Sequence, residues 1–335
     1  MPQRVDDVRD ISRIAYGFMA SKVLFAALDL DLFGLLAARP KDGAELAADT
    51  GLQPSRLEIL LTACVSLGLV VKRNETYANA PASQTYLVRG APSYFGDYYR
   101  FQIDRQIYPA FARLADAVRG ERAEFYRLMD NPAEALSFSR GQHAGSLGPA
   151  AVLARTIDLR GSRRLLDVGG GSGAFSITLC QRFSDLTATI LDHPSVQPAA
   201  GMFIREAAME ERIRFIPGDA LTTEWPDRQD VVLLSYLLSA VSAQGIDQLL
   251  ARAFAALTPG GRIVLHDFMV DDDGCGPTTA ALWLVNALLI DPDVARLSPK
   301  LLEAHLRARG FEEIGNVEVI PGITRTVTAV KRSEV

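Results

Sequence analysis

Glycines crowd one short stretch near the middle of the chain, Leu165-Leu166-Asp167-Val168-Gly169-Gly170-Gly171-Ser172-Gly173-Ala174-Phe175. Because glycine has no Cβ, such a loop turns sharply and lets a ligand approach the backbone. The apolar residues before the loop predict a buried strand, and those after it predict a helix whose first amides point at the ligand. The stretch therefore predicts a strand, turn and helix that together bind a small molecule.

Alternating strands and helices continue from this loop toward the end of the chain. Short apolar stretches that end at polar or glycine residues predict five strands, over residues 164–168, 188–191, 213–217, 230–234 and 262–267. This order is typical of an open parallel sheet, whose ligands bind beyond the carboxyl ends of the strands. We therefore predict an α/β domain with a Rossmann-like, doubly wound sheet over residues 156–335.

Three carboxylates follow successive predicted strands. Asp167 ends the first, and Asp192 ends the second, about twenty residues past the loop, where a carboxylate can accept hydrogen bonds from ribose hydroxyls. Gly218-Asp219-Ala220 follows the third strand and offers an acceptor to an adenine amino group. The three positions predict an adenosyl ligand.

Two adenosyl ligands fit this pattern. With Ala174 at its last position, the loop also satisfies the tolerant dinucleotide pattern GxGxxA, which keeps an NAD-dependent dehydrogenase as an alternative. Asp167 argues against it, because a carboxylate beside the glycines would repel a pyrophosphate and attract a cationic amino group.

The N-terminal part, residues 1–110, predicts a separate helical domain. Apolar residues recur at helical spacing from Ile11 to Arg39, two short helices follow over 43–50 and 54–67, and an alternating stretch predicts a small hairpin. This order is typical of a winged helix. The second short helix has one cation, Arg56, with which to contact a DNA groove, which argues against DNA binding. The long apolar first helix is better explained as a surface that is buried in a homodimer.

The formal net charge of -5 argues against a nucleic-acid surface and against a winged-helix transcription regulator. The chain starts with acidic and basic residues rather than the pattern of a signal peptide, and no apolar run approaches about 18 residues. We therefore expect a cytoplasmic protein without membrane or nucleic-acid partners. The three cysteines show no metal-ligand spacing, and we expect no metal.

The glycine loop, Asp192, Gly218-Asp219 and the turn of residues 257–262 resemble the class I S-adenosylmethionine methyltransferases. Together with the N-terminal domain, nearly the whole chain is similar to the dimeric small-molecule O-methyltransferases of plants and bacterial natural-product pathways. Residues 111–155 are expected to link the domains and line the pocket, and the stretch from Phe138 resembles a family helix whose later serine, here Ser146, binds the cofactor. The resemblance implies S-adenosylmethionine as cofactor, bound by Asp167, Gly169, Gly171, Gly173, Asp192, Gly218, Asp219, Ala220, Ser235 and Ser146.

The chain departs from the family where a proton is removed from the acceptor. Ser239 stands where most members carry a catalytic histidine, Ser235 replaces a cofactor-contacting lysine, and Gln142 replaces a methionine that packs on the acceptor. A serine is no base near neutral pH without a partner. His143 and His266 are the candidate bases, and Ser239 stays a catalytic candidate at the position of the family histidine. Asp267 stands where the family has a glutamate that orients the base, and alternation along the strand puts it and His266 on opposite faces.

The resemblance implies methyl transfer to oxygen or carbon of a small, aromatic or polyketide-like acceptor. The acceptor is expected to contact Gln142, Tyr236, Ser239, Trp283, Asn286 and Ile290. The missing histidine leaves three explanations open: positioning alone suffices, the acceptor is already ionised, or carbon is methylated. Relatives that retain the cofactor but catalyse hydroxylation or pericyclic reactions provide an alternative.

Overall fold

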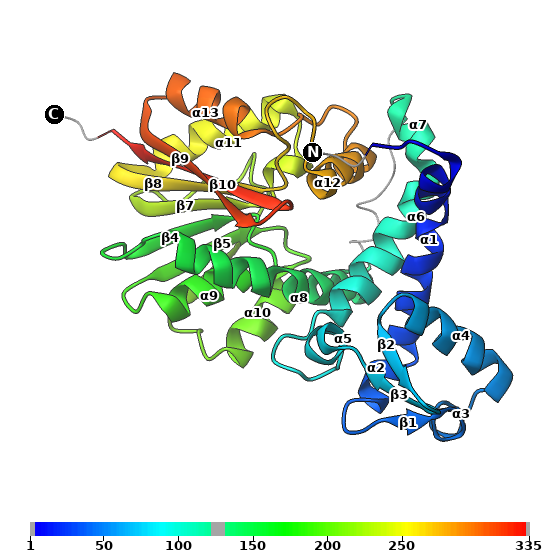
Figure 1. The fold of residues 1–335 in the computed structure, drawn as a ribbon. Helices are drawn as coiled ribbons and strands as arrows, with labels where there is room; N and C mark the ends of the chain where they lie inside the picture. Colours follow the sequence, from blue (N-terminus) through cyan, green and yellow to red (C-terminus); the bar gives the residue numbers. More distant parts are fainter. Residues whose placement is uncertain (1–3, 122–130, 333–335) are drawn as a thin grey trace. The chain divides into compact units, whose positions relative to one another are not determined.

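The computed structural model describes residues 4–121 and 131–332, in two compact units (Figure 1). The chain passes from one unit to the other between Gln106 and Ile107.

The second unit is built on a seven-stranded sheet with the order β6-β5-β4-β7-β8-β10-β9. β4 to β8 pair in parallel, which confirms the predicted α/β sheet, whereas β10 pairs antiparallel with both β8 and β9. β9 and β10 lie outside the five strands predicted from the sequence. The strands are β4 Arg164–Val168, β5 Thr187–Asp192, β6 Ile213–Pro217, β7 Gln229–Ser235, β8 Leu257–Asp267, β9 Phe311–Ile320 and β10 Thr324–Lys331.

Helices cover both faces of this sheet (Figure 1). Side chains alternate between the faces, so Leu165 joins one hydrophobic core and Leu166 joins the other. The first core packs α8 Pro132–Thr156, α9 Ala174–Arg182 and α10 Gln197–Glu206, and the second packs α11 Ala243–Ala256 and α13 Pro299–Ala308. Each fully buried leucine contributes about 1.5–3 kcal/mol to the free energy of folding. The carboxyl ends of the strands are therefore held by two well-packed cores.

Shorter helices of the same unit lie near those carboxyl ends. α12 packs against α7, η2 and the 3-10 turn η4, which follows β7. Their bounds are α6 Tyr108–Ala110, η2 Phe111–Arg113, α7 Leu114–Val118, η4 Leu238–Ala240 and α12 Thr278–Ile290.

The first unit has the predicted winged-helix order. Its helices are α1 Val8–Asp29, α2 Leu32–Leu35, α3 Gly43–Thr50, α4 Pro54–Ser66 and α5 Pro81–Tyr86, followed by the π-helix η1 Tyr98–Ile107. A three-stranded sheet holds β1 Lys41–Asp42, β2 Val70–Arg73 and β3 Thr76–Asn79. The β2–β3 turn contains Asn74 at φ 53°, a conformation that asparagine tolerates better than most residues.

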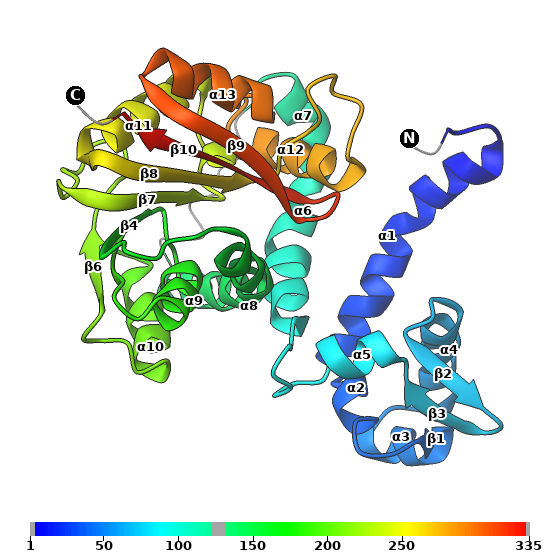
Figure 2. The same ribbon diagram turned by 60° about the vertical axis from the view of Figure 1, so that its left-hand side comes forward.

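By length and composition alone, α1 could cross a membrane, whereas the sequence predicted no apolar run of that length. The same helix carries the cations Arg9, Arg13 and Lys22, and Figure 2 shows its N-terminal half projecting beyond the short helices of its unit. Large apolar residues are exposed along that half, including Val8, Ile11, Ile14, Phe18 and Met19. This apolar surface is available to a partner.

Candidate functional site

The glycine loop joins β4 to α9 at the carboxyl edge of the sheet. Gly169, Gly171 and Gly173 have φ values of 67°, 54° and 81°, in the left-handed region that favours glycine. Gly170 is needed for a different reason, because a Cβ there would lie 2.6 Å from Cγ of Asp167. The loop therefore keeps its backbone open toward a cleft lined by Gln142, Ser146, Asp167, Gly169, Gly170, Gly171, Ser172, Ala174, Phe175, Ser235 and Tyr236.

Asp167 lies beneath this loop and is completely buried. Its Oδ2 accepts a hydrogen bond from the hydroxyl of Ser176 at 2.7 Å, whereas its Oδ1 has no partner among the described residues. Burial raises the pKa of Asp167 to about 7, and the nearby Asp192 adds to this rise. A cation placed at Oδ1 would satisfy the orphaned oxygen and stabilise the carboxylate.

Asp192 ends β5 beside the loop. Its Oδ2 accepts the Gly171 amide at 2.7 Å, and its Oδ1 accepts the His193 amide at 2.6 Å. Burial raises the pKa of this carboxyl although both amides lower it. Each carboxylate oxygen accepts more than one hydrogen bond, so Asp192 retains acceptor capacity for two hydroxyls.

Gly218, Asp219 and Ala220 follow β6. The Gly218 amide donates to the carbonyl oxygen of Asp192 at 2.8 Å, which ties the two strand ends together. Asp219 is exposed, and its Oδ1 accepts the Leu221 amide at 2.6 Å. The strand ends thus bring Asp192 and Gly218 into contact, as the parallel sheet predicts.

The middle of α8 contributes one wall of the cleft. Ser146 and Gln142 both line the cleft, and Gln142 approaches the glycine loop at Gly171. Gln142 therefore lies beside the glycine loop, and its contact with the acceptor stays a prediction.

His143 faces the loop rather than an acceptor. Its ring stacks on Phe203 with centroids 3.6 Å apart, and its Nδ1 lies 3.0 Å from Oγ of Ser172. Burial lowers its pKa to about 4, so the ring is neutral near pH 7. The geometry argues against the prediction of His143 as the base and indicates that it braces the loop.

His266 also differs from the predicted base. It is 0% exposed, and its Nδ1 and Nε2 lie 2.9 Å from Ser235 Oγ and 3.0 Å from Thr324 Oγ1. Burial lowers its pKa to about 3. With both nitrogens occupied by hydroxyls, His266 is a structural residue that joins β7, β8 and β10, and Ser235 serves this network at the edge of the cleft.

Asp267 lies on the opposite face of β8, as alternation predicts. It is completely buried, and its Oδ2 accepts the Ser239 amide at 3.0 Å while its Oδ1 accepts the Phe268 amide at 2.8 Å. Burial raises its pKa to about 6, although the Ser239 hydroxyl and these amides lower it. The carboxylate thereby holds the η4 turn against the end of β8.

An aromatic wall stands next to this turn. Trp283 of α12 stacks on Phe268 with centroids 4.4 Å apart and an interplanar angle of 11°, and Phe268 contacts the ring of Tyr236 at 5.0 Å. Tyr236 has φ 56°, a strained conformation for a residue with a side chain, and such strain is concentrated at functional sites. Asn286, on the same helix, is 9% exposed and its Oδ1 has no partner among the described residues. Ile290 ends the helix half-buried.

Three contributors to the site were missed at the sequence level: Ser176, Thr324 and Phe268. Ser176 lies in the first turn of α9, where a hydroxyl close behind a glycine loop is a detectable signal. Thr324 belongs to a strand that was not predicted, so no local signal pointed to it. In the described parts of the chain, no group of three or more His, Cys, Asp and Glu side chains could hold a metal ion.

The open loop, the orphaned oxygen of Asp167 and the acceptor capacity of Asp192 fit S-adenosylmethionine. Asp167 would hold its ammonium group and Asp192 its ribose hydroxyls. A parallel sheet with this loop and these acids defines a class I fold that binds an adenosyl cofactor.

Comparisons with known proteins agree. Residues 111–312 match the O-methyltransferase domain, and residues 12–89 match the O-methyltransferase dimerisation domain. The chain is 35% identical to a 3-hydroxy-5-methyl-1-naphthoate 3-O-methyltransferase of Streptomyces sahachiroi, over 96% of this chain and 94% of that protein. It is 31% identical to a tetracenomycin polyketide synthesis 8-O-methyl transferase of Streptomyces glaucescens, over 92% and 93%.

A solved structure gives the same result. Human N-acetylserotonin methyltransferase in complex with S-adenosylmethionine superposes with a TM-score of 0.86 and 28% identity, over 99% of this chain and 100% of that one. The chain belongs to the O-methyltransferase family. It is an S-adenosylmethionine-dependent methyltransferase with a dimerisation domain.

Proposed function

We propose that this enzyme methylates oxygen or carbon of a small natural-product acceptor with an aromatic or polyketide-like ring. The observation that carries the proposal is the aromatic wall of Tyr236, Phe268 and Trp283 beside the cofactor cleft. Flat rings stack on such a wall, and stacking adds about 0.5–1.5 kcal/mol to the burial of their surface. The two Streptomyces relatives carry names that specify a naphthoate and a polyketide, which supports an acceptor of this kind.

Polar groups near the aromatic wall would orient the acceptor. We assign acceptor contacts to Tyr236, Ser239, Trp283, Asn286 and Ile290. The buried Oδ1 of Asn286 has no partner among the described residues, and an unsatisfied buried acceptor costs about 1–3 kcal/mol. A hydroxyl or N–H group on the acceptor would remove that cost, so Asn286 favours ligands with a donor next to the ring.

The cofactor supplies an electrophilic methyl group when bound. The chain's own residues bind and orient this cofactor. Asp167 and Asp192 hold the two ends of the adenosyl ligand. The other residues assigned to cofactor binding are Gly169, Gly171, Gly173, Gly218, Asp219, Ala220, Ser146 and Ser235. Donor and acceptor held in contact account for much of the rate gain in an in-line displacement.

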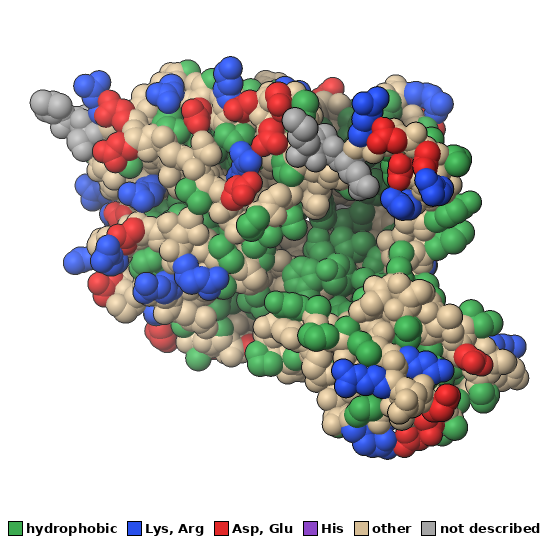
Figure 3. Space-filling model, in the orientation of Figure 1, with side chains coloured by type: hydrophobic (Ala, Val, Ile, Leu, Met, Phe, Trp, Pro, Cys, Tyr) green, Lys and Arg blue, Asp and Glu red, His purple; other side chains and the backbone are tan. Residues whose placement is uncertain are grey.

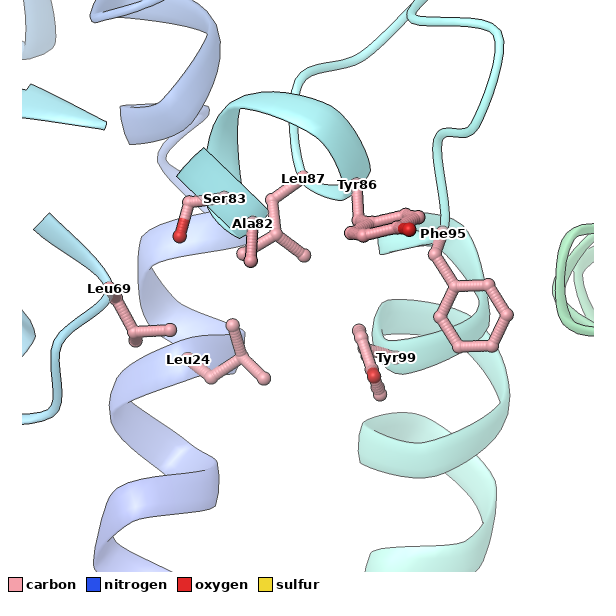
Figure 4. Close-up of a pocket in the computed structure, with 8 residues that line it drawn as sticks. All are labelled: Leu24, Leu69, Ala82, Ser83, Tyr86, Leu87, Phe95 and Tyr99. Carbon is pink, nitrogen blue, oxygen red and sulfur yellow. The ribbon is translucent and has the colours of Figure 1, made fainter. Parts of the chain in front are cut away.

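We also propose that the enzyme works as a cytoplasmic homodimer without nucleic-acid or membrane partners. The exposed apolar half of α1 needs a cover, and the match to a dimerisation domain favours a second copy. The same unit holds an apolar pocket of about 380 Å³; in Figure 4, Leu24 of α1 and Tyr99 of η1 face one another across it, below the α5 residues. On the face drawn in Figure 3, acidic and basic side chains are interspersed, unlike a phosphate-binding surface.

Product analysis tests the function. The enzyme is incubated with S-adenosylmethionine carrying a deuterated methyl group and a panel of hydroxylated naphthoates and polyketide aromatics, and products are identified by mass spectrometry. We expect one labelled methyl group on at least one acceptor. The Asp192→Ala variant is the control, because losing a charged hydrogen-bond partner weakens cofactor binding by about 1.5–3 kcal/mol. Products that gain oxygen, or isomers of unchanged mass, would contradict methyl transfer.

A further inference from the structure

Asp267 and Ser239 form a contact that the cofactor does not require. The carboxylate is completely buried at the carboxyl end of β8, and it accepts the Ser239 amide at 3.0 Å and the Phe268 amide at 2.8 Å. The hydroxyl of Ser239 interacts with the same carboxylate. A buried carboxylate with neutral donors around it is costly to ionise, which leaves it ready to accept a proton.

Ser239 connects this carboxylate to the acceptor side. Unlike Asp267, Ser239 is partly exposed, and its turn η4 packs against α12, the helix of Trp283 and Asn286. A serine hydroxyl that donates its hydrogen to a carboxylate keeps its lone pairs free to accept a hydrogen bond from a ligand. The geometry thus places a hydrogen-bond-accepting oxygen of the protein, Ser239 Oγ, next to the aromatic wall and in contact with the buried Asp267 carboxylate.

The other ionisable groups around Asp267 are already occupied. His266, its neighbour on β8, points to the opposite face and contacts Ser235 and Thr324. Arg325, opposite Asp267 in the β8–β10 register, donates to Asp271 and Glu318. No charged side chain of α12 faces the carboxylate, because Thr278–Ile290 contains none.

We propose that Ser239 and Asp267 act as a proton-accepting pair, and that the acceptor enters as a neutral hydroxyl. The inference rests on the proposed function and specifies its substrate class. An O–C bond forms at the acceptor while the S–C bond of the donor breaks and leaves its electron pair on sulfur. The acceptor's proton passes to Ser239 Oγ as the proton of Ser239 passes to Asp267, which later releases it to solvent. Ser239 touches the acceptor, and Asp267 is a positioning residue that acts through it.

Acceptors of different acidity test the pair. Wild type, Ser239→Ala and Ser239→Thr are compared on two naphthols, one with a hydroxyl pKa near that of tyrosine, about 10, and one ionised at pH 7. For the weakly acidic naphthol, we expect Ser239→Ala to lower kcat by about 10²–10⁴-fold, the usual range for proton transfer, and Ser239→Thr to restore most of it. For the ionised naphthol, Ser239→Ala removes only a neutral hydrogen bond to the acceptor, and we expect a loss of about 2- to 10-fold, far smaller than for the weakly acidic naphthol.

A second readout does not depend on turnover. With S-adenosylhomocysteine in place of the donor, the absorbance of the bound weakly acidic naphthol reports whether it is neutral or ionised. We expect the neutral form at pH 7 in wild type and in Ser239→Ala, with S-adenosylhomocysteine affinity unchanged in both. The pH dependence of turnover is a separate readout. The acid limb of kcat is expected below about pH 6 in wild type, because Asp267 is then protonated, and it is expected to disappear in Asp267→Asn.

Three outcomes overturn the inference: equal losses in Ser239→Ala on both naphthols, no loss in Ser239→Ala on either, or a weakly acidic naphthol that binds as the anion. If wild type methylates no acceptor of any acidity, the proposed function fails with it. If wild type methylates both naphthols and Ser239→Ala is unchanged, the proposed function stands and the pair is wrong.

Discussion

Asp167 shows how one buried atom defines the chemistry of the cleft. Its Oδ2 is satisfied by Ser176 and its Oδ1 is not, so the folded chain carries an unsatisfied acceptor under the glycine loop. A buried carboxylate without a cation prefers the neutral form, and a bound ammonium group reverses that preference. The affinity for a ligand with an ammonium group therefore depends on the charge of Asp167.

This dependence predicts a pH effect on cofactor binding. The pKa of Asp167 is raised to about 7, so the carboxylate is ionised above that pH and protonated below it. We expect the affinity for S-adenosylhomocysteine to weaken as pH falls from 7.5 to 6, approaching tenfold per unit once below the pKa. Calorimetry at several pH values measures it. Asp167→Asn should bind weakly with little pH dependence, and the exposed Asp185→Asn should behave as wild type; a flat wild-type profile would remove Asp167 from the ammonium site.

Burial disfavours the charged form of the histidines as well, but for a base this lowers the pKa instead of raising it. His143 and His266 are buried among neutral partners, which lowers both pKa values well below 7. Each is a neutral hydrogen-bonding group near physiological pH. Their residue type alone suggested a base, and their surroundings argue against that role.

At the scale of elements, the strand-loop-helix unit of β4 and α9 depends on glycine for two separate reasons. Some positions require a left-handed backbone, and Gly170 requires space next to the fixed Asp167 carboxyl. The loop and the carboxylate therefore fit each other as one element.

Two glycine-to-alanine substitutions distinguish a position where a Cβ has no room from one where glycine only adds conformational freedom to the unfolded chain. Gly170→Ala places a Cβ 2.6 Å from Cγ of Asp167, which is held by Ser176, so we expect a loss of about 1–3 kcal/mol in the free energy of unfolding. Gly148→Ala, in α8, meets nothing within 4 Å and should stabilise the chain by about 0.5–1 kcal/mol. Urea unfolding measures both. Equal effects of the same sign would show that the loop yields to a methyl group.

For the whole molecule, the exposed apolar surface of α1 is the feature that a single copy leaves unexplained. Ile14 is 73% exposed and Val8 72% exposed, although both are large and apolar. The match to a dimerisation domain includes most of this helix and supports the proposed homodimer.

A charge on α1 should therefore dissociate the dimer. Ile14→Glu places a carboxylate in the proposed interface, and the loss of a central contact costs about 2 kcal/mol or more, roughly 30-fold in the dimer dissociation constant. Val317→Glu, on the exposed face of β9, is the matched control and should leave the dimer intact. Sedimentation velocity over a range of concentrations distinguishes them. A monomeric wild type, or a dimer equally strong in both variants, would contradict the assignment.

The sequence by itself determined the features that depend on neighbouring residues. The glycine loop and the polar ends of β4 to β8 are local patterns, because a strand, its turn and the next helix follow one another along the chain. They predicted the sheet and placed Asp167 and Asp192 at its edge, and the apolar spacing of α1 predicted a helix with a surface to cover.

Only the tertiary structure decided how the acids and histidines are used. Ser239 meets Asp267 across 28 positions, and His266 meets Thr324 across 58, on a strand whose antiparallel pairing no local pattern indicated. Burial and hydrogen bonds set the charge of each group, and both arise from segments that are distant in sequence. A residue's type states what it can do, whereas its packed neighbours fix its protonation and its role.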